Sequence, residues 1–213
     1  MENFHSDWVV ALLVLGFAFV GIGVWINGQK LGLLVDARNK MSLSRLQLVL
    51  WSWLLISAFA AVAYARQTMN IDMPQEIWAL MGISMGSAAG SVIVKGSKSK
   101  QQPSANANIA AGVTHVGLLV THAAPADASL KDLFSGEEVA DQKYVDIAKV
   151  QMFFFTLATV MGYALILWDA PLIVDKVNQH LQFPVLSTSL VTLLGISHAG
   201  YLTVKAAPKT PTA

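Results

Sequence analysis

The sequence contains no cysteine, which excludes disulfide bonds, thiolate nucleophiles and cysteine-ligated zinc. Charge is also scarce. Charged residues make up 13% of the 213 positions, whereas a typical soluble domain carries about 25%. Hydrophobic residues make up 54% of the chain. So few charges among so many apolar residues are typical of a protein that lies largely in a membrane.

Sequence motifs of enzymes are absent as well. The chain has no HExxH, no GxSxG, no phosphate-binding Gly-Lys-Ser/Thr loop and no dinucleotide fingerprint. His115 and His122 are close in sequence, but no carboxylate at metal-ligand spacing accompanies them. We therefore expect a protein that is not an enzyme and that uses no cofactor, no metal site and no nucleic-acid partner.

What the chain does contain is a set of charge-free stretches, which cover residues 8–26, 46–65, 77–94, 150–168 and 185–204. Each stretch is 18 to 20 residues long, and roughly 20 helical residues cross the hydrocarbon core of a bilayer. Buried helices of a soluble protein are the alternative, but five such stretches in a short chain disfavour it. The predicted fold class is an all-α integral membrane protein with five transmembrane helices.

Positive charges predict the orientation of these spans. If the amino terminus faces outward, the inner side carries twelve of the fourteen Lys and Arg residues, and only Arg66 and Lys176 lie outside. Cytoplasmic loops are enriched in Lys and Arg. We therefore expect a multi-pass protein of the cell (inner) membrane, with its amino terminus outside and its carboxyl terminus in the cytoplasm.

The spans divide the chain into five parts. These are the outer tail with the first span (1–26), a first helical hairpin with an inner segment (27–95), a cytoplasmic loop (96–145), a second hairpin (146–205) and a cytoplasmic tail (206–213). The loop begins with a polar, basic run typical of a flexible linker. Its last part, from residue 129 to the fourth span, looks helical, with Ser129 as the cap of a first turn and a break at Ser135-Gly136. The proline-containing tail is expected to fray.

The two hairpins resemble each other. Gln47 and Gln151 each follow a basic residue by two positions, and Leu-x-Gly-Ile-Ser occurs at residues 80–84 and again at 193–197. Both hairpins would run in, out and in again. This predicts a parallel internal repeat of spans 2–3 and 4–5, with chance convergence as the alternative. Gln47 also fits a capping box with Ser44, and a polar contact inside the bundle is a further interpretation of both glutamines.

Small residues dominate one face of the third span. Gly82, Gly86 and Gly90 recur at every fourth position, so they share a narrow helix face that lets another helix approach closely. Packing within the chain and self-association between copies are equally compatible with this pattern. Gly195 and Ala199 give the fifth span a similar small surface.

A second face of the third span carries hydroxyl groups. Ser84, Ser87 and Ser91 lead along it to Lys95. Such a stripe can line a pore or wet polar path, although bonding to helix backbone carbonyls is the simpler interpretation. His198 is the one ionisable residue well inside a predicted span, which makes it a functional candidate.

The cytoplasmic loop carries an acidic group, formed by Glu137, Glu138 and Asp141. Acidic side chains that precede a helix interact favourably with its dipole. Their functional interpretation is a docking surface for a cytoplasmic protein partner.

Three functions fit these features. The first is a homo-oligomer packed through small residues, with a channel or pore. The second is a membrane scaffold or signalling partner whose loop binds another protein. The third is a small-solute transporter built on two parallel hairpins. The glycine face and the serine stripe favour the first.

Overall fold

The computed structural model describes residues 4–107, 109–110, 112–169, 173–174 and 181–213. The described part is mainly helical, as the sequence predicts. Its α-helices are α1 (Phe4–Asn27), α2 (Leu43–Arg66), α3 (Gln75–Lys98), α4 (Ile147–Asp169) and α5 (Thr188–Ala206). The short elements are η1 (Gly32–Leu34), β1 (Ile71–Asp72), β2 (His115–Val116), β3 (Leu119–Val120), η2 (Pro125–Asp127), η3 (Leu130–Leu133), β4 (Ile173–Val174) and β5 (Leu181–Gln182).

Four of these helices, α1 to α4, are long and apolar enough to cross a membrane. The fifth, α5, has 19 residues and is not among them, because its hydroxyl side chains, His198 and Lys205 lower its hydropathy. The prediction of a membrane-type helical fold is therefore confirmed at this level, and four of the five predicted spans meet the length and composition criterion.

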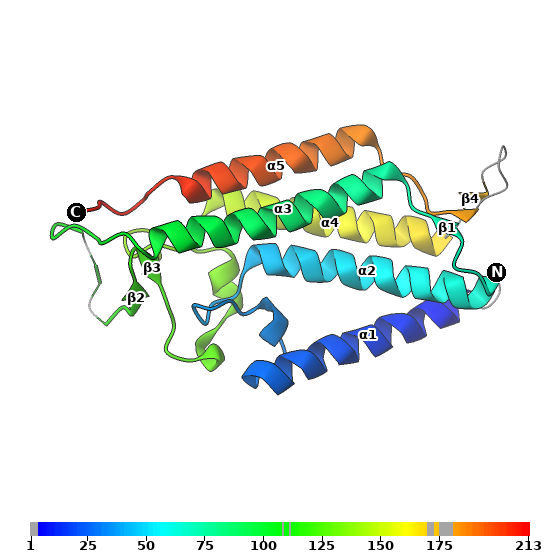
Figure 1. Cartoon of the computed structure of the whole chain (residues 1–213), viewed down its shortest axis with the longest axis horizontal. Helices are drawn as coiled ribbons and strands as arrows, with labels where there is room; N and C mark the ends of the chain where they lie inside the picture. The colour runs from blue at the N-terminus through cyan, green and yellow to red at the C-terminus, as the bar shows by residue number, and fades with distance from the viewer. Residues whose placement is uncertain (1–3, 108, 111, 170–172, 175–180) are drawn as a thin grey trace.

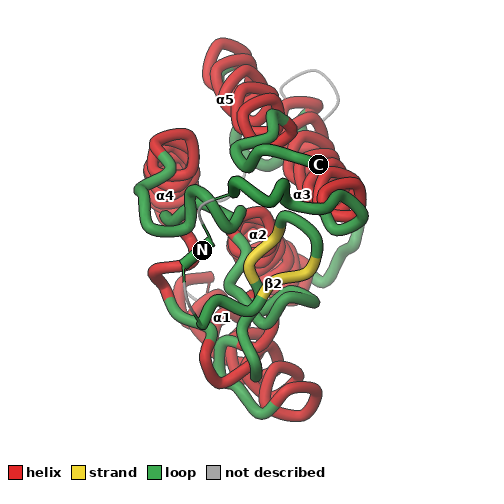
Figure 2. The backbone as a smooth tube through the Cα atoms, turned by 90° about the vertical axis from the view of Figure 1, so that its left-hand side faces the viewer, coloured by secondary structure: helices red, strands yellow, loops and turns green. Residues whose placement is uncertain are grey.

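The helices lie side by side along the long axis of the molecule (Figure 1). Contacts join α2 to α3, α3 to α5, α5 to α4 and α4 back to α2, and α1 packs against α2 from outside this ring (Figure 2). Two indole groups fasten α1: Trp8 donates to the Ser57 hydroxyl at 3.0 Å, and Trp53 donates to the Leu12 carbonyl at 2.8 Å. The opposite face of α1 exposes large apolar side chains, among them Val14, Phe17 and Trp25.

The helix ends follow local backbone signals. Gly28, with φ of 73°, follows the last residue of α1 and donates its N–H to Val24 O at 3.0 Å. Gln67 ends α2 in the left-handed conformation, with φ of 53°. Pro74 is the N-cap of α3. Glycine at a helix carboxyl end and proline at an amino end are favoured because of their backbone preferences.

The two ends of the bundle differ in structure. At one end, here called the basic end, α2 and α4 begin and α1, α3 and α5 finish. The far end holds a three-stranded sheet in which β5 pairs parallel to β1 and antiparallel to β4. Of the two cations that the sequence assigns to the far side, Arg66 ends α2 and Lys176 lies outside the described residues.

The core changes character along the bundle. Its larger apolar cluster lies between α2, α3, α4 and α5 toward the far end and includes the buried side chains of Trp51, Leu80 and Tyr163. A smaller cluster near the basic end includes Leu34, Met41, Leu43, Leu133, Met152 and Tyr201. Apolar side chains at such positions provide the main packing stabilisation of a membrane bundle, where van der Waals contact replaces the hydrophobic drive.

Two expectations for the basic end are wrong. In the segment from residue 129 to the fourth span, the expected turn after Ser129 is present as η3, with Ser129 as its N-cap. No helix follows the break at Ser135-Gly136: the chain runs through turns, and α4 begins only at Ile147. The tail does not fray, because Thr210 is buried and the Ser104 N–H donates to Pro211 O at 2.8 Å. The same bond shows that the linker-like run is held by tertiary contacts.

Candidate functional site

Polar side chains from four helices meet inside the bundle. Gln47 of α2, Thr156 of α4 and His198 of α5 are all buried. The Gln47 amide donates to the Thr156 hydroxyl at 2.5 Å, and its Nε2 lies 3.5 Å from His198 Nε2. The polar contact expected of Gln47 is therefore made to Thr156 and His198.

The serine stripe of α3 faces the same interior. Ser84, Ser87 and Ser91 are each at most 2% exposed. Gly195 of α5 lies opposite Ile83, and Leu202 lies opposite Gly90, so α3 and α5 run parallel. This register puts Ser87 at the level of His198. We call Gln47, Ser84, Ser87, Ser91, Thr156 and His198 the polar interior.

Several atoms of the polar interior have no hydrogen-bond partner among the described residues. They are Gln47 Oε1, His198 Nδ1 and the hydroxyls of Ser84, Ser87 and Ser91. The stripe serines thus do not bond helix backbone carbonyls, unlike Thr192, which donates to Thr188 O at 2.8 Å. Buried polar groups are almost always paired with protein or with ordered water. Water is the natural partner for such atoms, which lie along about two turns of α3 and on the helices that face it.

The glycine face of α3 points away from this interior. A Cβ atom on Gly82 or Gly86 would meet no heavy atom of the described chain within 4 Å. At Gly90 it would lie 3.0 Å from Leu202 Cδ1, so only the third glycine packs within the chain. Ala199 is exposed, and a Cβ on Gly195 would contact only Ile83, at 3.5 Å.

At the basic end the polar interior continues into a group of ion pairs. The Tyr201 hydroxyl lies beside Ser44 and Ser91 and accepts a hydrogen bond from Lys205 Nζ at 2.9 Å. Lys205 Nζ in turn lies 2.6 Å from Glu137 Oε1. A chain of polar groups therefore runs from the middle of α3 to the long loop, residues 99–146.

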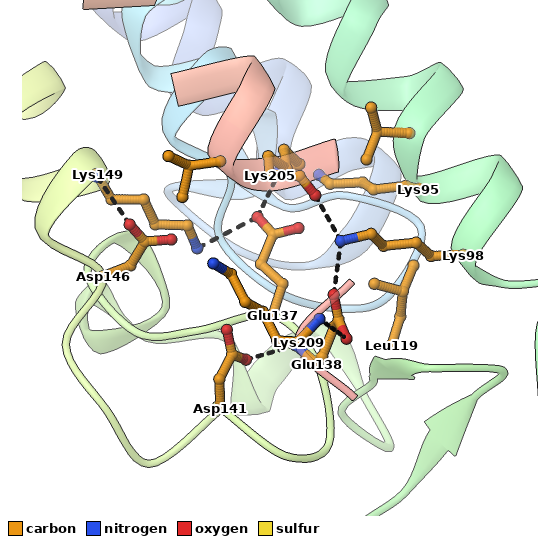
Figure 3. A pocket seen from close by; sticks show the side chains of 12 residues that line it. Lys95, Lys98, Leu119, Glu137, Glu138, Asp141, Asp146, Lys149, Lys205 and Lys209 are labelled. Carbon is orange, nitrogen blue, oxygen red and sulfur yellow. Dashed lines mark hydrogen bonds and ion pairs between the residues drawn. The ribbon is translucent and has the colours of Figure 1, made fainter. Parts of the chain in front are cut away.

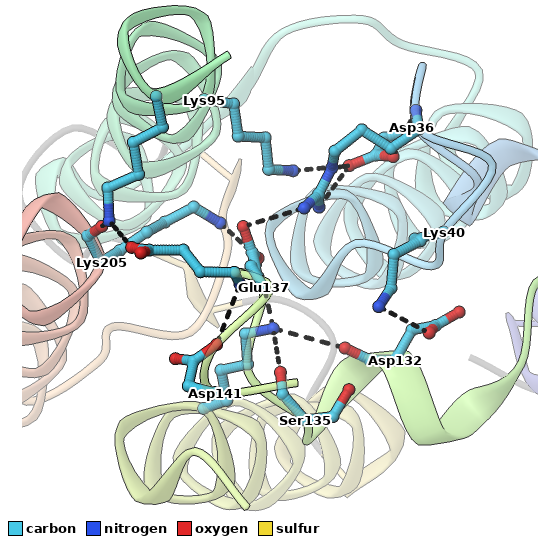
Figure 4. Close-up of polar contacts among 12 residues, drawn as sticks. Asp36, Lys40, Lys95, Asp132, Ser135, Glu137, Asp141 and Lys205 are labelled. Atoms are coloured by element: carbon cyan, nitrogen blue, oxygen red, sulfur yellow. Dashed lines mark hydrogen bonds and ion pairs between the residues drawn. The ribbon is translucent and has the colours of Figure 1, made fainter. Parts of the chain in front are cut away.

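Glu137 is the centre of these ion pairs (Figures 3 and 4). Its carboxylate contacts Lys205, Lys149 at 3.2 Å and Arg38 at 3.4 Å. Burial raises the pKa of Glu137, but these cations and Lys95 outweigh it and hold the pKa well below its usual value of 4.5. We call Arg38, Lys95, Lys149 and Lys205 the cationic ring. Its members come from four parts of the chain, so the ring forms only when the bundle is assembled.

Asp36 balances the other side of the ring. It accepts from Lys95 Nζ at 2.7 Å and from Arg38 Nη2 at 2.8 Å. Burial raises the pKa of Asp36, but Arg38 and Lys95 dominate and keep it below the usual range. Arg38 therefore bridges Asp36 and Glu137, and burial, which lowers its pKa, is outweighed by these two carboxylates, so its pKa is raised.

Two neighbouring pairs fasten the loop and the tail. Lys98 Nζ lies 2.5 Å from Glu138 Oε1 and also donates to the carbonyls of Lys205 and Ala207. Glu138 Oε2 accepts the N–H groups of Lys209 and Thr210. Separately, Lys40 Nζ lies 3.3 Å from Asp132 Oδ1. The carboxyl-terminal tail, α3 and the long loop are thus held together at Glu138.

The acidic residues expected to form a docking surface are engaged within the chain. Glu137 and Glu138 make the ion pairs above, and Asp141 accepts the Glu138 N–H at 2.9 Å. Burial raises the pKa of Asp141, and the nearby Glu138 adds to the effect. These carboxylates therefore hold the loop against the helices.

Two further expectations differ from what the structure shows. The N-cap of α2 is Ser42 and makes no side-chain cap bond, so Ser44 and Gln47 do not form a capping box. Gln151 is exposed, whereas Gln47 is buried, so the two glutamines do not share an environment. Sequence reasoning also missed Asp36, Arg38 and Tyr201. A paired acid and base in the short segment 28–42 was the available signal for the first two.

No protein family, curated protein or solved structure matches this chain. Among the described residues no group of three or more His, Asp or Glu side chains is placed to hold a metal ion.

Proposed function

We propose that this protein is a non-enzymatic membrane protein that moves protons along a hydrated path inside its own helix bundle. The observation that carries the proposal is the group of buried, unpaired polar atoms on α2, α3 and α5. Hydroxyl, amide and imidazole groups of this kind can hold water in line, and the two nitrogens of an imidazole can accept a proton on one side and donate one on the other. The interior has no fixed charge that would bind a metal ion or an anion at this depth.

The path has two closed points in the described conformation. Toward the far end the polar lining stops at Ser84, and the buried side chains of Ile77 and Leu80 follow on α3. At the basic end Glu137 sits among the cations of the ring. Passage therefore requires both points to open, which favours slow, gated flux over a permanently open pore.

Proton flux into liposomes tests the proposal. The protein is reconstituted with a pH-sensitive dye inside the vesicles, and a potassium diffusion potential supplies the driving force. Ser87→Val replaces a hydroxyl of the path by an apolar group and should reduce the flux at least about tenfold, because water loses a partner and space. Ala89→Val adds volume on an exposed position of the same helix and should leave the flux unchanged. Wild-type flux no higher than that of protein-free vesicles would refute the proposal.

The membrane topology belongs to the same proposal. We infer five spans, α5 included, with the basic end in the cytoplasm of a cell whose inner membrane holds the protein. Support comes from the positive charges gathered at one end of the bundle. Protease accessibility of the long loop in sealed vesicles of known orientation tests this.

A parallel repeat of the two hairpins requires the matching helices to run in the same direction, and they do. α2 runs parallel to α4, since Gln47 meets Thr156 and Trp51 lies 6.3 Å from Tyr163 between ring centroids. α3 runs parallel to α5 in the same way. We propose that the hairpins descend from one duplicated unit, with α1 added outside it.

Self-association is a second candidate property, and it is favoured by the open glycines. Because nothing in the described chain packs on Gly82 or Gly86, this face is free to take a helix of another copy in lipid. In this arrangement each copy keeps its own path, so the oligomer interface and the pathway are separate surfaces.

A further inference from the structure

The cationic ring contains more positive than negative charge. Arg38, Lys95, Lys149 and Lys205 face two carboxylates, Asp36 and Glu137. Lys149 and Lys205 have side chains that are only 3% and 6% exposed. Buried cations are costly unless they are paired. Here four cations share two carboxylates, so one more anionic group could bind without leaving the ring with excess negative charge.

Three other carboxylates lie near the ring, but among the described residues they form no ion pair with its four cations. Asp141 and Asp146 line the same cavity, but each accepts a backbone N–H, from Glu138 and Lys149 respectively. Glu138 is taken by Lys98 and by the tail. The lysine ammonium groups use carbonyl oxygens instead: Lys149 donates to Ser135 O at 2.7 Å.

The cavity itself is small. It lies between the ends of α3 and α5, the beginning of α4 and the long loop (Figure 3). Its volume of about 20 Å³ is enough for one water molecule. A phosphate group can enter only if the Glu137 carboxylate leaves, because that carboxylate occupies the position at which three cations converge.

We propose that the cationic ring is a binding site for a phosphate group, and that Glu137 occupies it as an internal substitute for that ligand. Two or three charge-assisted hydrogen bonds from Arg38, Lys149 and Lys205 suit the oxygens of a phosphate, which presents more acceptors than a carboxylate. The ring lies at the end of the bundle, so free phosphate and the phosphate of a lipid headgroup can both reach it. Ligand entry displaces the loop at Glu137 and opens the basic end.

Phosphate binding at the ring is independent of proton passage, and binding is measured without any flux. A protein that binds phosphate at the ring but conducts no protons would uphold this inference and refute the proposed function, and the reverse outcome would separate them equally well.

The first arm of the test uses inorganic phosphate. The full chain is placed in nanodiscs of neutral lipid, and its thermal unfolding is followed as phosphate replaces chloride at constant ionic strength. Glu137→Gln removes the competing charge and keeps the shape of the side chain. It should bind phosphate about tenfold more tightly than the wild type, the effect expected for removing one charged hydrogen-bonding competitor.

Matched controls separate the ring from general charge effects. Glu76→Gln makes the same chemical change in the first turn of α3, at the far end, and should not alter the response to phosphate. Lys205→Gln should abolish the response, whereas Lys131→Gln, at an exposed position, should keep it. An equal response from Glu137→Gln and Glu76→Gln would overturn the proposal.

The second arm uses lipid. Nanodiscs of neutral lipid with a small share of phosphatidic acid are compared by native mass spectrometry for lipid retained on the protein. Retention that rises with Glu137→Gln and falls with Lys205→Gln identifies a headgroup as the source, and a response to inorganic phosphate alone identifies the free ion. If Glu137→Gln does not fold, the wild type and Lys205→Gln still give the test. The proposal is overturned if neither phosphate nor phosphatidic acid stabilises the wild type. It is also overturned if these ligands stabilise Lys205→Gln as much as they stabilise the wild type.

Discussion

Lys98 of α3 and Glu138 of the long loop form an ion pair of 2.5 Å, with side chains only 7% and 2% exposed. Neither residue is isolated: Lys98 also donates to two carbonyls of the carboxyl-terminal segment, and Glu138 accepts two backbone N–H groups from the tail. The pair therefore joins three segments that are far apart in sequence. It explains why a tail rich in proline and polar residues is ordered.

Breaking this pair should strongly destabilise the basic end. Lys98→Met keeps the length of the side chain but leaves the Glu138 carboxylate buried without its cation, and such a loss costs roughly 3–5 kcal/mol. Lys100→Met, at an exposed position, removes the same charge and should change stability by less than about 0.5 kcal/mol. Denaturant unfolding in detergent measures both. Equal effects of the two variants would show that the pair contributes little.

The Gln47–Thr156 hydrogen bond should couple α2 to α4. Hydrogen bonds between membrane helices contribute roughly 0.6 kcal/mol on average and up to about 1.7. A double-mutant cycle of Gln47→Leu and Thr156→Val should give a coupling energy in this range. The matched cycle pairs Gln151→Leu with Thr156→Val and should give none, because Gln151 is exposed. Additive effects in the first cycle would contradict the contact.

A larger side chain should have different effects at Gly86 and at Gly90 of the glycine face. An added Cβ at Gly86 meets no heavy atom of the described chain within 4 Å, so with Gly86→Leu the monomer should keep its thermal stability while self-association in lipid is lost. Gly90→Leu pushes against Leu202 and should destabilise the monomer, typically by 1–3 kcal/mol for overpacking. Unfolding midpoints and crosslinking in nanodiscs measure the two effects. Unchanged crosslinking in Gly86→Leu would exclude this face as the interface.

Low pH should destabilise the basic end. The pKa of Glu137 is lowered in the folded state, with the usual value of 4.5 as reference, and the pKa of Asp132 is lowered from 3.8. A lowered folded pKa means that stabilisation is complete above the usual value and is lost as the pH falls through the folded one. These groups should therefore stabilise the fold fully and independently of pH between pH 7 and 5, and the unfolding midpoint should decrease as the pH is lowered below about 4.5.

Glu137→Gln provides the comparison for the acid effect. Since an amide does not titrate, this variant should begin with lower stability at neutral pH and lose less of it on acidification than the wild type. A variant that retains the full acid loss of the wild type would assign the effect to other carboxylates.

The residue pattern predicted the helices better than it predicted the loops. Charge-free stretches of spanning length located all five helices, because continuous apolar composition is a local property. In the run after Ser129, the predicted turn forms as η3, but the helix predicted after the break at Ser135-Gly136 begins only at Ile147. Between these points Glu137 and Glu138 pair with Lys205 and Lys98, and these tertiary contacts outweigh the local preference for a helix.

For the serine stripe of α3, too, the sequence predicted the local pattern but not the tertiary surroundings. The spacing of Ser84, Ser87 and Ser91 placed them on one face of α3, but spacing alone does not say whether that face meets lipid, water or protein. The structure turns it inward, toward Gln47 and His198. The acidic group of the loop was likewise visible, yet Glu137 and Glu138 look like surface residues until their lysine partners on three helices are known.

The sequence by itself therefore determined that this is a largely apolar helical chain, with its positive charges gathered between particular spans and with two distinct faces on α3. These properties depend on composition and on helical period, which are local. Only the tertiary structure decided that the serines are buried and two of the glycines open, and that Glu137 lies within a ring of cations. Those relationships join residues as far apart in the sequence as Arg38 and Glu137. Charges at such a separation become partners only after the helices have packed.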